Sequence, residues 1–343
     1  QNIHQTTLQG KAIKVRLIPI GAAIVALEVK DKDGHWQDVV LGYDDLDHYL
    51  KHNDPAIGVV HALLSNRTKN ASFSLENQNY HLHKNVAPHA LHAGDIRSKH
   101  FESRPIDEKD KKGVCYYYQT SDLFEGLPGP SKISIAYYLD QDDLFYIDYQ
   151  VEAQQNTIVA NMTNHSYFNL DGCTKEGLRN HHLELAASSY VDIDQDYIPS
   201  GKIKPLSQAM DFSTSKGIDP LCDQHNEPMA SAGGYDFHYV LDAKLVRKTI
   251  AQQPVIATLA SKKTGIVMEL ATSYPGVQLY TANSLDQVGG KNNCHYQKHS
   301  SVCLETQYHP DAINNPNFPD VRILPYQKQH NISVYRFSTQ TTA

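Results

Sequence analysis

The residues with the clearest chemical potential lie near the end of the chain, where 301–307 reads SVCLETQ. Alternation of apolar and polar side chains predicts a strand over 301–305, with Val302 and Leu304 on one face and Glu305 on the other. A Pro- and Asn-rich segment follows. A carboxylate at the end of a buried strand needs partners, because burial without them costs free energy. Glu305 is therefore either a capping or salt-bridged acid, or a general base whose pKa is set by partial burial.

A second stretch contains a histidine of matching chemistry. Residues 161–170 read NMTNHSYFNL, with His165 near the middle. Histidine and a carboxylate can each give and take a proton near neutral pH. If the fold brings His165 beside Glu305, distant parts of the chain supply one acid–base pair.

Together the two stretches resemble the aldose 1-epimerases, also called galactose mutarotases. That family has an N-H-S-Y-F-N-L motif with the acid histidine and, further on, an L-E-T-Q motif with the base glutamate; both occur here in that order. The resemblance implies that Glu305 takes the proton of the C1 hydroxyl and that His165 protonates the ring oxygen. The opened aldose then rotates about C1–C2 and closes on its other face. The implied activity interconverts the α and β anomers of aldohexoses such as galactose and glucose.

Four further motifs extend the resemblance and imply sugar contacts. SNR at 65–67 resembles A-N-R-I, LHAG at 91–94 resembles L-H-G-G, GGYD at 233–236 resembles G-G-Y-D, and PGVQ at 275–278 resembles P-G-V-Q. The implied substrate-binding residues are Asn66, Arg67, His92, Asp236 and Gln278. Read without the resemblance, Arg67 is a surface arginine, His92 a solvated turn histidine and Asp236 a turn residue that accepts from backbone amides.

The resemblance covers most of the chain, and its departures lie mostly in the first third. Ala62-Leu63 stands in place of the family's G-R, and Ala93 replaces a glycine. Phe101 lies near the position of a common tryptophan, and Phe237-His238 replaces His-Asn. We expect these changes to touch the rim that contacts the sugar, and so to affect substrate preference rather than the reaction.

Composition excludes several classes of function. The 343 residues are 40% hydrophobic and 20% charged, and the net charge of -7 argues against a nucleic-acid partner. No apolar run reaches the length of about 18 residues typical of a membrane span. The five cysteines are odd in number and show no C-x-x-C pair, so neither a zinc knuckle nor a disulfide framework is indicated. The 19 histidines show no metal-ligand spacing, so we expect no metal and no cofactor.

Short alternating segments separated by Gly and Pro turns predict a strand-rich fold. Strands are expected at 38–41, 115–119, 133–139, 145–151, 158–162 and 332–337, among others, and a short helix at 44–52. The charged run 107–112 reads as a solvated loop. No linker or repeat divides the chain, which predicts one domain over 1–343. The expected fold is all-β, a large antiparallel β-sandwich with few short helices, and the resemblance specifies the galactose mutarotase-like supersandwich.

Three alternatives remain open. A glycoside hydrolase needs two carboxylates across the scissile bond, whereas the matched partner of Glu305 is a histidine. An epimerase of hexose 6-phosphates needs clustered cations, for which only Arg67 and Arg97 are available. A non-catalytic sugar-binding domain does not require the Glu305–His165 pair. Partners beyond an aldose, the choice between monomer and homodimer, and the compartment stay undecided: cytoplasmic by the resemblance, or periplasmic or secreted if Gln1 is a processed terminus.

Overall fold

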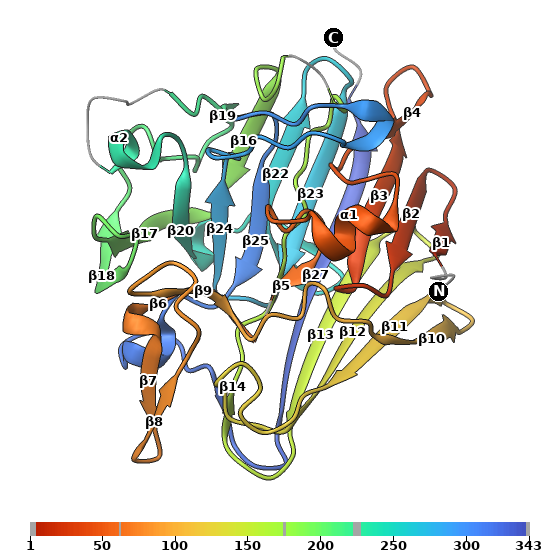
Figure 1. The fold of residues 1–343 in the computed structure, drawn as a ribbon. Helices are drawn as coiled ribbons and strands as arrows, with labels where there is room; N and C mark the ends of the chain where they lie inside the picture. Colours follow the sequence, from red (N-terminus) through yellow and green to blue (C-terminus); the bar gives the residue numbers. More distant parts are fainter. Residues whose placement is uncertain (1–4, 62, 174–175, 222–227, 341–343) are drawn as a thin grey trace.

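The computed structural model describes residues 5–61, 63–173, 176–221 and 228–340, and antiparallel strands make up most of it (Figure 1). The largest sheet has ten strands, in the order β10-β11-β12-β13-β27-β23-β22-β16-β19, with β21 paired to β22. Its strands are β10 (Glu102–Asp107), β11 (Lys111–Gln119), β12 (Ser131–Asp140), β13 (Phe145–Ala153), β16 (His181–Leu185), β19 (Lys216–Gly217), β21 (Thr249–Ile250), β22 (Gln253–Ser261), β23 (Ile266–Thr272) and β27 (Lys328–Thr339).

A second sheet of five strands has the order β18-β17-β20-β24-β25. These are β17 (Ala187–Ile193), β18 (Pro199–Pro205), β20 (Asp236–Leu241), β24 (Gly276–Tyr280) and β25 (Cys303–Gln307). One face of this sheet is apolar, because Phe237, Leu279 and Leu304 lie opposite one another across the three strands and belong to the main core.

The N-terminal part of the chain forms a four-stranded sheet, with β1 (Thr6–Gln9), β2 (Ile13–Ile18), β3 (Ala23–Lys30) and β4 (Trp36–Asp38). Four two-stranded sheets complete the β structure: β14 (Ile158–Val159) with β26 (Arg322–Ile323), β15 (Thr163–Asn164) with β5 (Val60–His61), β6 (Leu64–Thr68) with β9 (Ala90–Ala93), and β7 (Ser72–Leu75) with β8 (Gln78–His81).

Helices are few and short in the described residues. They are α1 (Leu46–Lys51), α2 (Met229–Ala232) and the 3-10 turns η1 (Lys69–Ala71), η2 (Ala243–Leu245), η3 (Lys291–Asn293) and η4 (Ala312–Asn314). α1 lies within the predicted range 44–52 but begins two residues later, because the Asp45 side chain accepts from the backbone N–H of His48 at 3.0 Å and caps the first turn. Within the described residues, neither α-helix has the length and apolar character needed to cross a membrane.

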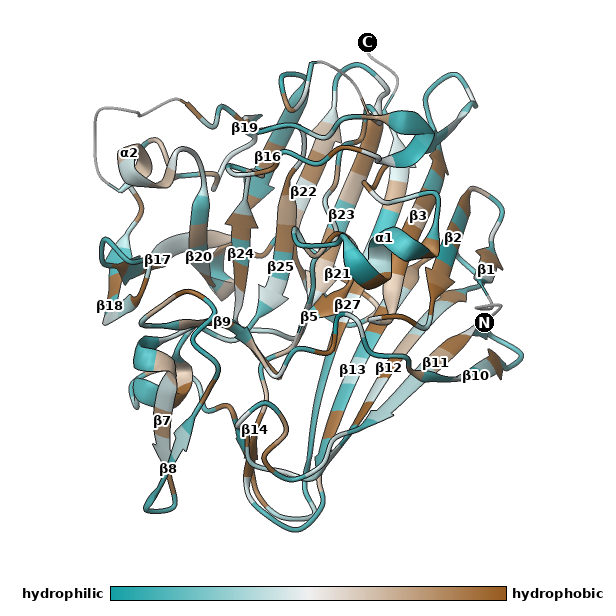
Figure 2. Ribbon diagram, viewed as in Figure 1, coloured by the Kyte–Doolittle hydropathy of each residue, from teal (hydrophilic) through white to brown (hydrophobic). Residues whose placement is uncertain are grey.

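The core lies between the sheets, and hydrophobic residues concentrate on the strands while the connecting loops are mostly hydrophilic (Figure 2). β12 shows the expected alternation, with Ile133, Ile135 and Tyr137 buried in the core. β23 is buried at every position because both of its faces are covered, so it shows no alternation. The predicted class, an antiparallel β-sandwich with few short helices, is confirmed.

Three local predictions need correction. The strand expected at 38–41 ends at Asp38, and Val40 makes only an isolated bridge to Phe168. The strand expected at 158–162 is limited to β14. The charged run 107–112 is not a loop throughout, because Asp107 ends β10, Lys111 begins β11, and Lys112 forms an ion pair with Asp107 across the turn.

The cysteine prediction is also wrong in part. Cys173 and Cys294 form a disulfide that joins the segment after 161–170 to the segment after β24. Cys115 and Cys303 are buried free thiols, and Cys222 lies outside the described residues. An odd cysteine count without a C-x-x-C pair therefore did not exclude a single long-range disulfide.

Candidate active site

Three neighbouring strands place three of the predicted residues on one face of the five-stranded sheet. Gln278 of β24 lies opposite Glu305 of β25, and Asp236 of β20 lies opposite Tyr280 of β24. Because side chains two residues apart share a face, Asp236, Gln278 and Glu305 all project away from the apolar core. β25 is therefore buried on both sides, by the core and by the layer that carries His165.

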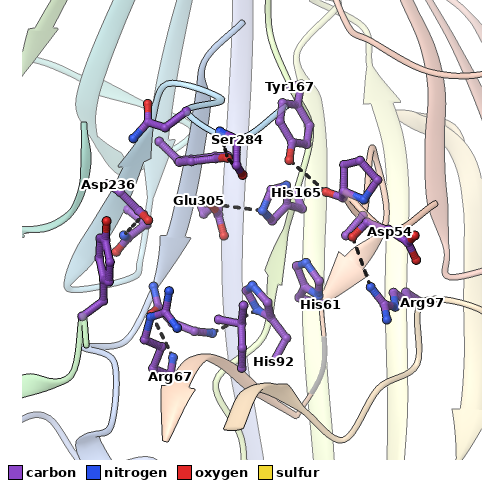
Figure 3. A pocket seen from close by; sticks show the side chains of 18 of the residues that line it. Asp54, His61, Arg67, His92, Arg97, His165, Tyr167, Asp236, Ser284 and Glu305 are labelled. Atoms are coloured by element: carbon purple, nitrogen blue, oxygen red, sulfur yellow. Dashed lines mark hydrogen bonds and ion pairs between the residues drawn. The ribbon is translucent and has the colours of Figure 1, made fainter. Parts of the chain in front are cut away.

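The segment that leads into β5 holds His165 through the backbone. The N–H of His165 donates to the carbonyl of Val59 at 2.8 Å, and its own carbonyl accepts from the N–H of Gly58 at 3.0 Å. The side chain reaches toward β25, where Nε2 lies 3.5 Å from Oε1 of Glu305 (Figure 3). The His165 and Glu305 side chains are only 8% and 3% exposed, so the pair is nearly removed from solvent.

Asn66, Arg67 and His92 enter the site from the two-stranded sheet of β6 and β9. The pairing of these strands is irregular between Leu64 and Arg67, and Asn66 and His92 adopt left-handed backbone conformations with φ of 67° and 54°. Such conformations are uncommon for non-glycine residues and concentrate at functional sites. The backbone N–H of Asn66 donates to Nδ1 of His92 at 3.0 Å, which fixes the ring of His92.

The last residue of the LHAG segment, Gly94, occupies a position that favours glycine. Gly94 has φ of +76°, and a Cβ at this position would lie 2.5 Å from Cδ1 of Leu127. A side chain at this position would be strained by the positive φ and would require Leu127 to shift, which favours glycine. The preceding position, Ala93, carries its methyl group at the end of β9.

All seven residues predicted from the sequence line one cavity of about 450 Å³ (Figure 3). They are Asn66, Arg67, His92, His165, Asp236, Gln278 and Glu305. Several other lining residues were not predicted, among them Asp54, His61, Asp95, Arg97, Tyr167, Tyr197 and Ser284. Tyr167 lies within the 161–170 motif, and its aromatic character was the available signal. His61 carried no signal, because its strand has only two residues.

The polar atoms of the cavity are arranged to receive a ligand. Nε2 of Gln278 donates to Oδ1 of Asp236 at 2.8 Å, while Oε1 of Gln278 and Oε2 of Glu305 are buried and have no hydrogen-bond partner among the described residues. Buried polar atoms are normally paired, so these two oxygens are suited to accept hydrogen bonds from a bound molecule. Arg67 stacks over the ring of Tyr197 at 4.9 Å.

Burial shifts the proton affinities of the central groups. Desolvation, assisted by the nearby Asp236 carboxylate, raises the pKa of Glu305 well above its usual value. Desolvation lowers the pKa of His165 to about 4. Desolvation also raises the pKa of Asp236, against the opposing effects of Gln278 and Arg67. Burial therefore favours the uncharged form of both groups.

The departures from the family motifs lie only partly where expected. Leu63, Phe101 and Phe237 belong to the hydrophobic core, so the prediction that these positions touch the rim is wrong. His238 lines a smaller cavity beside Arg67, and its Nε2 lies 3.0 Å from Nδ1 of the buried His309. Ala62 lies outside the described residues.

Three histidines gather in the cavity although the sequence shows no ligand spacing. Ring nitrogens of His61, His92 and His165 lie within 4.8 Å of one another. Because Nδ1 of His92 accepts from Asn66, the neutral ring carries its proton on Nε2 and offers no lone pair to a metal. The rings of His61 and His92 are stacked and nearly parallel, with their centroids 3.7 Å apart. This arrangement does not suit a tetrahedral metal site.

The cations of the cavity do not form a phosphate site. Nε of Arg97 pairs with Oδ2 of Asp95 at 2.9 Å, and its Nη1 donates to the backbone carbonyl of Asp54 at 3.4 Å. Arg67 lies at the other side, near Asp236 (Figure 3). The two arginines are thus separated, and each has a carboxylate nearby.

The fold and the site define a class of protein, an all-β enzyme with a buried carboxyl–imidazole pair in a polar cavity of the size of a small metabolite. Comparison with known proteins specifies the class. The profile of the aldose 1-epimerase family matches residues 4–334. The chain is 34% identical to human galactose mutarotase over 98% of this chain and 94% of the relative, and 29% identical to the aldose 1-epimerase of Haemophilus influenzae over 91% and 88%.

A solved structure of an aldose epimerase homologue from C. elegans superposes with a TM-score of 0.87 at 27% identity, covering 99% of this chain and 100% of that one. A galactose 1-epimerase from Lactobacillus acidophilus has the same fold, with a TM-score of 0.85 at 20% identity. The chain belongs to the aldose 1-epimerase family, and it is an isomerase of the mutarotase type.

Proposed function

We propose that this protein interconverts the α and β anomers of free aldohexoses such as galactose and glucose, with Glu305 as base and His165 as acid. The observation that carries the proposal is the distance of 3.5 Å between Nε2 of His165 and Oε1 of Glu305 inside a polar cavity. We also propose that residues 1–343 form one domain, in keeping with the family match over 4–334.

The reaction needs a single proton on the Glu305–His165 pair, carried by His165 when the ring opens. Glu305 accepts the proton of the C1 hydroxyl while Nε2 of His165 delivers a proton to the ring oxygen, and the ring opens. After rotation about C1–C2, the carboxyl returns its proton to the aldehyde oxygen, His165 recovers a proton as the ring closes, and the other anomer results. A carboxyl with a raised pKa is a stronger base than usual, and an imidazole with a lowered pKa is a stronger acid.

The remaining predicted residues hold the sugar. Arg67 supplies a charged donor, His92 presents Nε2–H, and Asp236 and Gln278 offer oxygen acceptors on the same face as Glu305. Asn66 lines the cavity and orients both His92 and, through its side-chain oxygen, the backbone N–H of Arg67 at 2.8 Å. Each hydroxyl group of an aldose can both donate and accept a hydrogen bond, so the sugar can pair with the donors and the acceptors of this set.

The experiment is polarimetry on freshly dissolved α-D-galactose and α-D-glucose, with glucose 6-phosphate as a third substrate. We expect faster relaxation to the anomeric equilibrium than in buffer for the two free sugars and little effect on the phosphate ester. Relaxation at the buffer rate for both free sugars, with calorimetric sugar binding intact, would favour a non-catalytic binding protein. Acceleration restricted to the ester would favour a sugar-phosphate epimerase.

A further inference from the structure

Strand β25 contacts both ring nitrogens of His165. Cys303 and Glu305 are two residues apart and share one face of the strand. Oε1 of Glu305 lies 3.5 Å from Nε2 of His165, and Sγ of Cys303 lies 3.7 Å from Nδ1 of the same ring. The proposed reaction uses the first contact and assigns nothing to the second.

The sulfur at Nδ1 is a neutral thiol. Cys303 is fully buried and takes no part in a disulfide. Desolvation, with the carboxylates of Glu305 and Asp236 nearby, raises the pKa of this thiol well above its usual value, so it keeps its proton. A thiol sulfur is a weak hydrogen-bond acceptor, which suits an N–H donor at this distance.

We propose that Cys303 is a positioning residue whose sulfur accepts the Nδ1–H of His165, so that only Nε2 gains and loses a proton during the reaction. The inference rests on the proposed role of His165. In the imidazolium state both nitrogens carry protons, and Nε2 gives its proton to the ring oxygen. The neutral ring that remains keeps Nδ1–H on the sulfur and turns a free Nε2 lone pair toward Glu305, which carries the proton taken from C1.

The uncharged sulfur also suits the acidity that the reaction requires. The bond made by one ring nitrogen decides which nitrogen carries the proton in neutral histidine. A carboxylate at Nδ1 would fix the same tautomer but would stabilise the imidazolium and weaken it as an acid. A thiol fixes the tautomer without adding charge.

Without the sulfur, the neutral ring has a competing tautomer. Nδ1–H would then lose the sulfur as its acceptor, whereas a proton on Nε2 could donate to Oε1 of Glu305. That second tautomer cannot receive a proton at Nε2 and is unproductive. Removal of the sulfur is therefore expected to lower kcat and to leave KM nearly unchanged.

The test is ¹⁵N NMR of the histidine rings at neutral pH in the ligand-free protein, with the His165 resonances identified by their loss in His165→Asn. We expect protonated Nδ1 in the wild type and in Cys303→Ser, whose hydroxyl is also an acceptor. Cys303→Ala should shift the ring toward Nε2–H and lower kcat by roughly three- to tenfold, the scale of one weak hydrogen bond. Cys115→Ala, which removes a buried free thiol of β11, is the matched control and should change neither property.

Several results would overturn the inference. These are a wild-type His165 protonated on Nε2, a Cys303→Ala variant with unchanged tautomer and kcat, or a Cys303→Ser variant that loses activity as fully as the alanine variant. The NMR measurement needs no catalysis and no variant at 303. If Nδ1 of His165 is protonated in the wild type but the protein has no mutarotase activity, the proposed function is contradicted while the role of the sulfur is supported.

Discussion

Gln278 donates from Nε2 to Oδ1 of Asp236 at 2.8 Å, and this hydrogen bond fixes which end of the amide faces the cavity. Among the residues that the structure describes, neither the buried Oε1 of Gln278 nor Oε2 of Glu305, on the neighbouring strand, has a hydrogen-bond partner. Asp236 therefore has two effects: it orients a neighbouring acceptor, and its charge raises the pKa of Glu305. Binding and base strength are linked through this carboxylate.

Asp236→Ala should impair both effects. We expect KM for galactose to rise by roughly ten- to a hundredfold, since a lost charged hydrogen bond costs about 1–3 kcal/mol. The alkaline limb of the rate profile should also move to lower pH, because Glu305 loses a neighbouring negative charge. Asp107→Ala, at an exposed position of β10, is the control. Unchanged kinetics for every aldose tested would remove Asp236 from the site.

The dependence of kcat/KM on pH follows from the two shifted groups, because this ratio reports the pKa values of the ligand-free protein. Activity requires one proton on the pair, so it falls when a second proton binds at low pH and when the single proton leaves at high pH. The acid limb should lie near pH 4, because burial lowers the pKa of His165 to about 4. The alkaline limb should lie above the usual carboxyl range, because burial raises the pKa of Glu305.

Rates should be measured by polarimetry, with circular dichroism at each pH to show that the protein stays folded. The unperturbed pKa of histidine is about 6.5, so an acid limb at that pH would contradict the buried environment assigned to His165.

Exhaustive chelation should leave the rate unchanged. The histidine cluster does not suit a metal, because Nδ1 of His92 is occupied and the ring of His61 lies parallel to that of His92. Polarimetric rates before and after treatment with EDTA test this. Loss of activity that a divalent ion restores would show that the three rings rearrange around a metal.

The disulfide should contribute strongly to stability. Cys173 and Cys294 are separated by 121 positions, and closing a loop of this length stabilises by up to about 5 kcal/mol in the chain-entropy model. Cys294→Ser should therefore lower Tm markedly, and Cys173→Ser/Cys294→Ser should be no worse. Cys115→Ser serves as the control for loss of a buried sulfur. A Tm that is the same in wild type and Cys294→Ser would show that the pair contributes little.

The sequence predicted the strands in which core-facing and outward-facing residues alternate. β12 and β13 lie with alternate residues in the core, so a period of two is visible in their sequences. Alternation also predicted a strand at 301–305, which overlaps β25. It did not predict that both faces of β25 are buried, with polar side chains paired inside; Oγ1 of Thr306, for example, lies 2.8 Å from Oγ of Ser333.

The catalytic pair came from motif resemblance, since no local pattern relates His165 to Glu305. Residues whose placement depends on long-range packing were missed. His61 enters the cavity only because β5 pairs with β15, and each of these strands has two residues. The disulfide depends on the same kind of long-range approach, between segments that carry no shared motif.

The central claim is that Glu305 and His165 exchange protons with the sugar, and Glu305→Gln tests it most directly. Glutamine keeps the size of the side chain but cannot accept the C1 proton. Galactose binding measured by calorimetry should persist, while the polarimetric rate should fall by roughly a hundredfold or more. His165→Asn should behave alike, and the double variant should be little slower than either, because the two groups act in one event. A Glu305→Gln protein that binds galactose and still interconverts its anomers at the wild-type rate would contradict the assignment.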